Sequence, residues 1–165
     1  MTQQDSVTFE VDASGVGLVT FDQPGRAMNV LTPELLGRFA TLLERLEQEE
    51  GLKGLVLTSG KSSFIAGADI REFRTFAERG ETIDAIKRGH RVFAKLAGLK
   101  MPTVAAIHGH CMGGGLEISL ACRYRIAVDE PGTKFALPEV MLGIVPGWGG
   151  MLRLPQLVGP AAAST

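Results

Sequence analysis

The stretch TVAAIHGHCMGGGLEISLACRYRIAV, residues 103–128, contains two apolar strand-like runs separated by a helix-like run. Residues 103–107 predict a buried strand, and residues 124–128 predict the next one. Between them, the triple glycine Gly113–Gly115 opens an apolar helix. A helix between two apolar strands is typical of a parallel sheet with crossover connections. The fold class that we predict is therefore α/β.

The same alternation of strands and helices extends toward the N-terminus. The turn signal Asp12–Gly15 separates two strand-like runs. Thr32 and Pro33 are typical of the cap and the first position of a helix. The pattern therefore predicts a hairpin of strands 7–11 and 16–21, a helix after Thr32, a strand at 54–58 and a helix at 82–99.

The composition restricts the class of protein. The chain has 165 residues, 45% of them hydrophobic, which suffices for one domain with a sizeable core. Seventeen basic and eighteen acidic residues nearly cancel, so neither nucleic acid nor an anionic membrane is the expected partner. No apolar run approaches the ~20 residues of a membrane span, and the start resembles no targeting signal. We expect a cytoplasmic protein with Cys111 and Cys122 reduced and buried.

Two glutamates follow unusual backbone signals. Glu117 closes the triple-glycine motif, and Glu139 follows Leu137 and Pro138 just before a second glycine-rich run. Glycines and helix N-termini expose N–H donors to a ligand. A carboxylate beside such donors can move a proton while an oxyanion forms. The pattern indicates a catalytic site, although surface positions for both glutamates are the plain alternative.

Four motifs resemble those of one known family, and they occur in its order between about Val7 and Gly159. Residues 105–117, AAIHGHCMGGGLE, resemble the first signature of the crotonase (enoyl-CoA hydratase) superfamily. Residues 137–155, ending in PGWGGMLRLP, are similar to its second signature. Residues 64–70, FIAGADI, resemble its coenzyme-A loop, and residues 26–29, RAMN, its first substrate-contacting turn. The amino-acid sequence of these motifs is most similar to that of the N-terminal hydratase portion of multifunctional fatty-acid oxidation α subunits. Together the motifs are specific, whereas any single glycine cluster would be weak.

This resemblance implies a fold, a reaction and a set of site residues. The implied fold is a spiral of ββα units, and the implied reaction adds water to 2-trans-enoyl-CoA in fatty-acid β-oxidation. It implies an acyl-CoA thioester as the substrate, no cofactor and no metal, and assembly as a homo-oligomer or within a fatty-acid oxidation complex. The implied roles are catalysis by Glu117 and Glu139, an oxyanion hole of the Ala68 and Gly114 N–H groups, a water contact at Gly147, and coenzyme-A contacts at Arg26, Ala27, Met28, Ala66, Gly67, Asp69 and Ile70. A Cβ at Gly114 is then expected to occupy the space of the thioester.

The chain also departs from the family pattern. Trp148 stands where a small residue is usual, and Met151 and Leu152 replace polar residues, so the preferred acyl length is open. The residues from Ala161 resemble the first turn of a longer helix. We therefore expect one domain over residues 1–165, cut at its C-terminal end before the helices that would cover the site. The apolar residues that cluster near the cut are then expected to be exposed, namely Ile144, Val145, Trp148, Met151, Leu152 and Leu157. A frayed natural tail is the alternative.

Several other functions remain as alternatives. A Δ3-Δ2-enoyl-CoA isomerase would need one main carboxylate instead of two. An inactive structural or coenzyme-A-binding fragment is the alternative from another class. His108 and His110 lack a third ligand for a metal, and Gly54 lies one residue too far from Lys61 for a phosphate-binding P-loop. Arg71 and Arg26 are either phosphate ligands or solvated charges.

Overall fold

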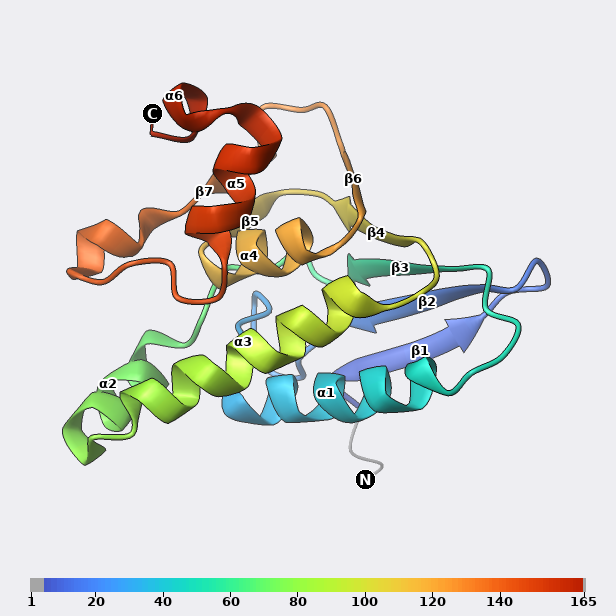
Figure 1. Ribbon diagram of the computed structural model, residues 1–165, viewed down its shortest axis with the longest axis horizontal. Coiled ribbons are helices and arrows are strands. Elements are labelled where there is room, and N and C mark those ends of the chain that lie inside the picture. Colours follow the sequence, from blue (N-terminus) through green and yellow to red (C-terminus); the bar gives the residue numbers. More distant parts are fainter. Residues whose placement is uncertain (1–4, 165) are drawn as a thin grey trace.

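The computed structural model describes residues 5–164 (Figure 1). Its body is a sheet in the order β1-β2-β3-β4-β6, in which β1 pairs antiparallel with β2 and all other pairs are parallel. A smaller parallel sheet pairs β5 with β7. The strands are β1 (Val7–Val11), β2 (Val16–Phe21), β3 (Gly54–Ser59), β4 (Thr103–Ile107), β5 (His110–Met112), β6 (Tyr124–Ala127) and β7 (Lys134–Ala136).

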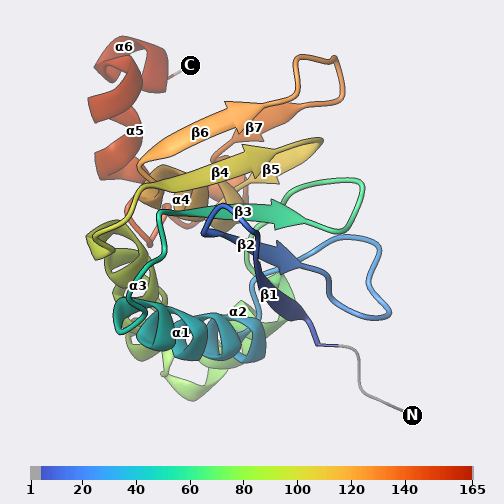
Figure 2. The same ribbon diagram turned by 90° about the vertical axis from the view of Figure 1, so that its right-hand side faces the viewer.

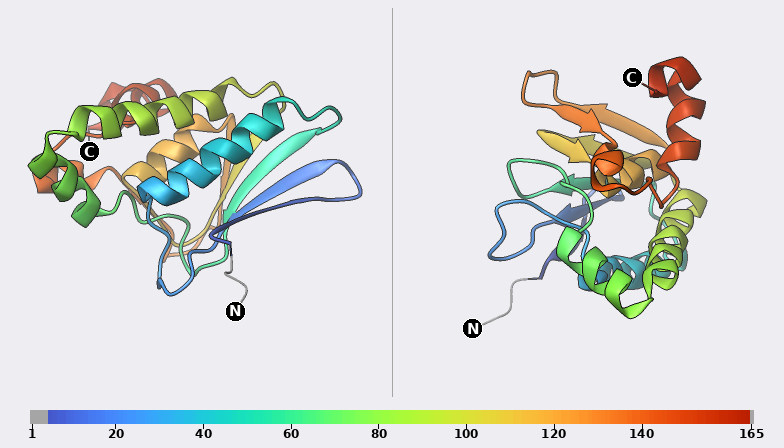
Figure 3. Two further views of the ribbon diagram at one scale, coloured as in Figure 1. Left: turned by 90° about the horizontal axis from the view of Figure 1, so that it is seen from below. Right: turned by 90° about the vertical axis from the view of Figure 1, so that its left-hand side faces the viewer.

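The helices of the first half cover one side of the large sheet, where α1, α2 and α3 lie together (Figure 2). The view from below shows α1 and α3 side by side (Figure 3). The helices are α1 (Pro33–Glu47), α2 (Ile70–Arg79), α3 (Thr82–Gly98), α4 (Gly114–Ala121), α5 (Gly150–Val158), α6 (Pro160–Ala163) and the 3₁₀ helix η1 (Pro138–Leu142).

The chain repeats one supersecondary unit. After β4 in the large sheet come β5 in the small sheet and then α4; the sequence β6, β7 and η1 repeats this order. Ile65 adds a parallel bridge to Cys111, so the segment after β3 joins the same small sheet. This is the predicted spiral of strand-strand-helix units.

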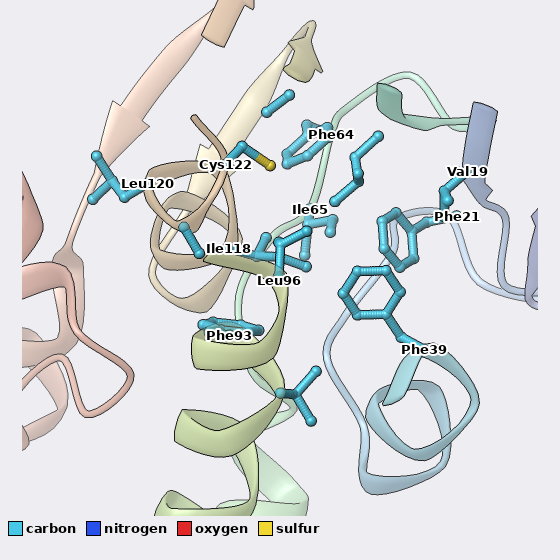
Figure 4. Close-up of a cluster of buried hydrophobic side chains, with 14 of the residues drawn as sticks. Val19, Phe21, Phe39, Phe64, Ile65, Phe93, Leu96, Ile118, Leu120 and Cys122 are labelled. Atoms are coloured by element: carbon cyan, nitrogen blue, oxygen red, sulfur yellow. The ribbon is translucent and has the colours of Figure 1, made fainter. Parts of the chain in front are cut away.

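The core lies between the sheet and its helices. Helix α1 starts as predicted, because the Thr32 side chain accepts a hydrogen bond of 3.1 Å from Leu35 N–H and Pro33 occupies the first helical position. The Phe21 and Phe39 rings join β2 to α1 edge to face at 5.2 Å, and Phe93 of α3 lies on the opposite side of the cluster (Figure 4). This packing fixes the helices against the strands whose ends carry the site.

Several elements differ from the sequence prediction. The strand predicted at 54–58 runs to Ser59, the helix predicted at 82–99 ends at Gly98, and the strand predicted at 124–128 ends at Ala127. Helix α2 was not predicted, although Ile70, Phe73, Phe76 and Ala77 recur at helical spacing among its five charged residues. The three-residue strands β5 and β7 and the helix η1 are too short to show a period.

Two further expectations concern burial and membranes. Both cysteines are free and buried, as predicted, and burial raises the pKa of the Cys111 and Cys122 thiols to about 12. Neither thiol is therefore a nucleophile near neutral pH. No helix within residues 5–164 has the length and apolar character needed to cross a membrane.

Candidate active site

A cavity of about 700 Å³, here named the glutamate cavity, lies between the 66–70 loop, the start of α4 and the segment 138–148. Its size is within the range of small-molecule sites. It brings together most of the predicted site residues. The predicted residues that line it are Ala66, Gly67, Ala68, Ile70, Gly114, Glu117, Glu139 and Gly147.

Glu117 is buried on α4, with 2% of its surface exposed. Its Oε1 accepts hydrogen bonds from the backbone N–H of Trp148 at 2.7 Å and of Gly150 at 2.9 Å. A Cβ at Gly150 would lie 3.0 Å from Glu117 Cγ, so the glycine lets the chain approach this close. The carboxylate is thus oriented by two fixed donors rather than by solvent.

Burial is the largest influence on the acidity of Glu117, and it raises the pKa of this carboxyl above its ordinary value. The hydrogen bonds from Gly150 and Trp148 oppose that rise because they favour the ionised form. The negative charge of Glu139 adds to the rise, and the positive charge of Arg153 opposes it. The buried carboxyl is therefore a weaker acid than an exposed one, which suits a group that takes up a proton during a reaction.

Glu139 lies on η1 and is half-buried. Its Oε2 is buried, with no hydrogen-bond partner in the described part of the chain, and burial raises its pKa as well. A Cβ built on Gly113 would lie 2.9 Å from Glu139 Oε1, which places this carboxyl against the start of α4. Gly113 also has φ +52°, a conformation that favours glycine. The second carboxyl is therefore in the cavity but lacks protein donors at one oxygen.

The backbone N–H groups of Ala68 and Gly114 form a candidate anion site beside the two glutamates. Leu31 N–H binds Gly67 O at 2.8 Å and Asp69 N–H binds Leu31 O at 3.3 Å, which anchors the loop without using Ala68 N–H. A Cβ on Gly67 would lie 3.9 Å from the Gly114 nitrogen, so this loop adjoins the start of α4. Within residues 5–164, no backbone hydrogen bond engages the N–H of Ala68 or of Gly114. Both donors remain available to a ligand.

Gly114 must be glycine for a reason that the sequence did not predict. We expected a Cβ there to occupy the space of the ligand. In the structure it would lie 2.6 Å from the Trp148 ring and 2.9 Å from Leu31 Cδ1. The space beside Gly114 is already filled by protein, and the expectation about this contact was wrong.

The predicted contacts outside the cavity form a separate group. Arg26 Nη1 lies 3.0 Å from Asp69 Oδ2, and Asp69 is buried and caps α2 through the N–H of Arg71. Burial opposes ionisation of Asp69, but the Arg26 and Arg71 contacts prevail and hold its pKa below the ordinary value. Ala27 and Met28 are exposed and do not line the glutamate cavity. Arg71 is 84% exposed, and its Nε lies 3.5 Å from Asp69 Oδ1.

Three contributions to the site were missed at the sequence level. The prediction gave Gly147, which lines the cavity, a backbone contact to the catalytic water, but it assigned no role to the N–H groups of Trp148 and Gly150 that donate to Glu117. Arg153 was not assigned a role, and its Nη1 donates to Trp148 O at 3.0 Å. The glycine-rich run 147–150 was the available signal. It marks close approach without telling which N–H group points inward.

The two histidines of the HGH motif, His108 and His110, do not line the glutamate cavity. His108 Nε2 lies 2.7 Å from Lys61 O, and His110 is exposed. No cluster of three or more potential metal ligands occurs among the residues that the structure describes.

Comparison with known proteins identifies relatives across nearly the whole chain. Residues 12–165 match the family model described as enoyl-CoA hydratase/isomerase. The fatty acid oxidation complex subunit alpha of Shewanella amazonensis is 45% identical over 150 residues, which is 90% of this chain and 21% of that protein. The same subunit of Idiomarina loihiensis is 42% identical over 96% of this chain and 23% of its own length.

Solved structures are also similar to the chain over nearly its whole length. The enoyl-CoA hydratase of Bacillus anthracis has a TM-score of 0.88 and 30% identity, covering 97% of this chain and 61% of its own. DspI of Pseudomonas aeruginosa has a TM-score of 0.88 and 32% identity, covering 99% of this chain and 61% of its own. The chain thus spans about a fifth of the length of its α-subunit relatives and about three fifths of these solved chains. It belongs to the enoyl-CoA hydratase/isomerase family.

Proposed function

We propose that the chain adds water to 2-trans-enoyl-CoA and forms 3-hydroxyacyl-CoA, as in fatty-acid β-oxidation. One observation carries the proposal: two carboxyl groups with raised pKa values line one cavity beside two unused N–H donors. Two acids that face one water suit hydration because one can take a proton while the other gives one.

The proposed step assigns each carboxyl one proton transfer. Glu117, ionised, takes a proton from water while the water oxygen bonds to C3 of the enoyl group. The electron pair of the double bond moves toward the thioester oxygen, and the N–H groups of Ala68 and Gly114 stabilise the enolate. Glu139, protonated, then gives its proton to C2. Gly147 N–H is the proposed contact to the attacking water.

The step leaves Glu117 protonated and Glu139 ionised, and exchange with solvent restores both. The carbons undergo no net oxidation, so the proposed step needs no redox cofactor, and the two carboxyl groups carry both proton transfers. The coenzyme-A part would lie along the loop Ala66–Ile70 and the turn Arg26–Met28 outside the cavity, where Arg26 and Asp69 join the two segments.

The names of the α-subunit relatives suggest the biological setting. We propose that the chain acts in the cytoplasm on acyl-CoA thioesters, in association with further copies or with other subunits of a fatty-acid oxidation complex. Exposed apolar side chains on η1 and α5, including Met141 at 84% and Leu152 at 67%, support such an association.

Loss of the enoyl-thioester absorbance on hydration tests the proposal. We expect Glu117→Gln and Glu139→Gln each to lower turnover by ~10²-fold or more, the scale of general acid–base assistance. Affinity for a saturated acyl-CoA should change little in either variant. Glu130→Gln, at an exposed position outside the cavity, is the control.

Three results would contradict the hydratase. Full activity in either glutamine variant would remove that residue from the mechanism. Conversion of 3-enoyl-CoA to 2-enoyl-CoA, with loss of activity through only one glutamate, would identify an isomerase. Binding of acyl-CoA without any turnover would identify a binding module.

A further inference from the structure

A second cavity, of about 380 Å³, lies between α1, α2 and α3; we name it the helix cavity. Three residues line both it and the glutamate cavity: Ala68, Ile86 and Trp148. Among residues 5–164 only these three are common to the two linings, so they form the wall between the cavities. Ala68 also carries one of the N–H donors beside the glutamates, which puts this wall next to the proposed thioester oxygen.

The Trp148 ring is held in this wall by two glycines. A Cβ on Gly89 of α3 would collide with the indole Nε1 and Cε2 atoms, and one on Gly114 would lie 2.6 Å from its Cζ3. Phe93 packs edge to face against the indole at 5.4 Å. Indole Nε1 is buried and has no hydrogen-bond partner among residues 5–164, so nothing polar holds the ring there. Shape alone keeps the indole in place.

The helix cavity has an apolar lining and a charged edge. Leu31, Leu36, Phe76 and Val92 are among the lining side chains. Its charged lining residues are mostly exposed, and the buried one, Asp69, is paired with Arg26. Lys95 lies 3.3 Å from Glu44, and the Arg88 guanidinium lies over the Phe76 ring. A hydrocarbon chain fits such an interior, whereas an anionic group would meet no unpaired buried cation there.

We propose that Trp148 sets the acyl-chain length of this enzyme by closing the passage from the glutamate cavity into the helix cavity. The proposal rests on the proposed hydratase function. Short acyl groups end against the indole. When the indole is absent, the distal methylenes of a longer acyl group enter the helix cavity between α1, α2 and α3. Gly89 is part of this arrangement, because the absence of a side chain at Gly89 leaves the slot in which the indole lies.

The activity test compares a 4-carbon with a 12-carbon 2-enoyl-CoA. Trp148→Ala should raise the ratio of kcat/KM for the long over the short substrate by ~10-fold or more, since one methylene in an apolar pocket already changes kcat/KM by ~10-fold or more. Trp148→Phe keeps an aromatic ring in the wall and should leave the ratio within about 3-fold of the wild-type value. An unchanged ratio in Trp148→Ala overturns the proposal.

Gly89 gives an independent variant. Gly89→Ala should force the indole out of its slot and shift the ratio in the same direction as Trp148→Ala. In the Trp148→Ala background, Gly89→Ala should have no further effect, because the two changes act on one contact. Gly98→Ala, on the same helix with nothing within 4 Å of its built Cβ among described residues, is the matched control. Independent, additive effects of the two changes would contradict a shared slot.

A binding experiment separates this proposal from the hydratase function. Trp148 is the one tryptophan of the chain, so its emission reports directly on the wall. Saturated butanoyl-CoA, which cannot be hydrated and whose short acyl group should end against the indole, should change this emission, whereas free coenzyme A should not. Equal changes with both ligands would overturn the proposal. An emission change specific to the acyl ligand, without hydration of any substrate, would refute the hydratase and leave the wall supported.

Discussion

The two glutamates of the cavity lie on structurally opposite supports. Glu117 is on α4, in which each of the eight residues is buried. Glu139 is on η1, in which none of the five residues is buried, and the neighbouring Val140 and Met141 are 78% and 84% exposed. One carboxyl is thus built into the core, and the other is carried by the surface.

The hydrogen bonds follow the same division. Glu117 Oε1 has two backbone donors, whereas Glu139 Oε2 has none in the part of the chain that the structure describes. A fixed carboxylate can orient a small nucleophile, and an unpaired one is free to bind a proton or a substrate atom. The contrast suits a fixed base and an adaptable acid in the proposed reaction.

The largest expected effect comes from filling the space at the rigid support. Gly114→Val should lower turnover by ~10²–10³-fold, the cost of losing one oxyanion donor, because the new side chain displaces Trp148 and Leu31 and shifts the N–H group. Hydratase rates and thermal unfolding of the same preparation check this. Gly98→Val, in open space on α3, is the control.

Wild-type rates in Gly114→Val would contradict the close packing at α4. If the valine variant does not fold, Gly114→Ala tests the same space, since the Cβ alone already meets the Trp148 ring.

A smaller effect is expected from Arg153, which acts on Glu117 through the backbone. Its guanidinium holds Trp148 O, and its charge lowers the pKa of Glu117. Arg153→Met should reduce kcat/KM by about 10-fold at neutral pH, within the range of general-base effects. Removing the charge raises the pKa of Glu117 further, so the acidic limb of the pH–rate profile should move to higher pH. Arg153→Lys should restore part of both losses, while a uniform loss without movement of the limb would show a purely structural role.

The site was predictable where the chemistry belongs to side chains in recognisable patterns. Glu117, Glu139 and the glycine-rich loops were identified, and the structure brings them to one cavity. The donors to Glu117 were not, because the direction of an N–H group depends on backbone angles such as the φ of +106° at Gly149. A run of several glycines is compatible with several such paths.

The fold, too, was predictable only where a local sequence pattern determines the element. The helix α3 and the apolar strands β3 and β4 were predicted within a residue of their bounds, and α1 starts where it was predicted. Helix α2 was missed although its apolar residues recur at helical spacing, and its position depends on the Asp69 cap and on packing against α3. The role of Trp148 as a wall depends on Gly89, 59 positions away in the sequence, and no local pattern joins the two.

At the buried support, replacing Glu117 should change the free energy of unfolding by about 1 kcal/mol at alkaline pH. Burial raises the pKa of Glu117, so its contribution to stability is complete below the ordinary value of 4.5 and is lost as pH rises through the raised value. Glu117→Gln removes this titration and keeps an oxygen for both N–H donors. It should therefore stabilise the protein by about 1 kcal/mol at pH 8, as active-site replacements often do, and hardly at pH 4. Urea unfolding at the two pH values measures the difference, and a gain as large at pH 4 would contradict burial of the charge as its cause.

The smallest effect on the free energy of unfolding is expected from replacements on the exposed segment from η1 to α5. Met141, Val145, Met151, Leu152 and Leu157 are all more than half exposed on the segment from η1 to α5, as expected for most of the apolar residues predicted to cluster there, while Trp148 and Ile144 are partly buried. Replacing Met141 and Leu152 by lysine removes no buried contact, so the free energy of unfolding should change by less than about 0.5 kcal/mol. The same change should weaken self-association, because charges disfavour burial of this apolar surface against another copy. Sedimentation at micromolar concentration should show the wild-type chain as associated and the double variant as less so. A monomeric wild-type chain would instead leave η1 exposed in solution, and the adaptable carboxyl of Glu139 would then have no partner surface beside it.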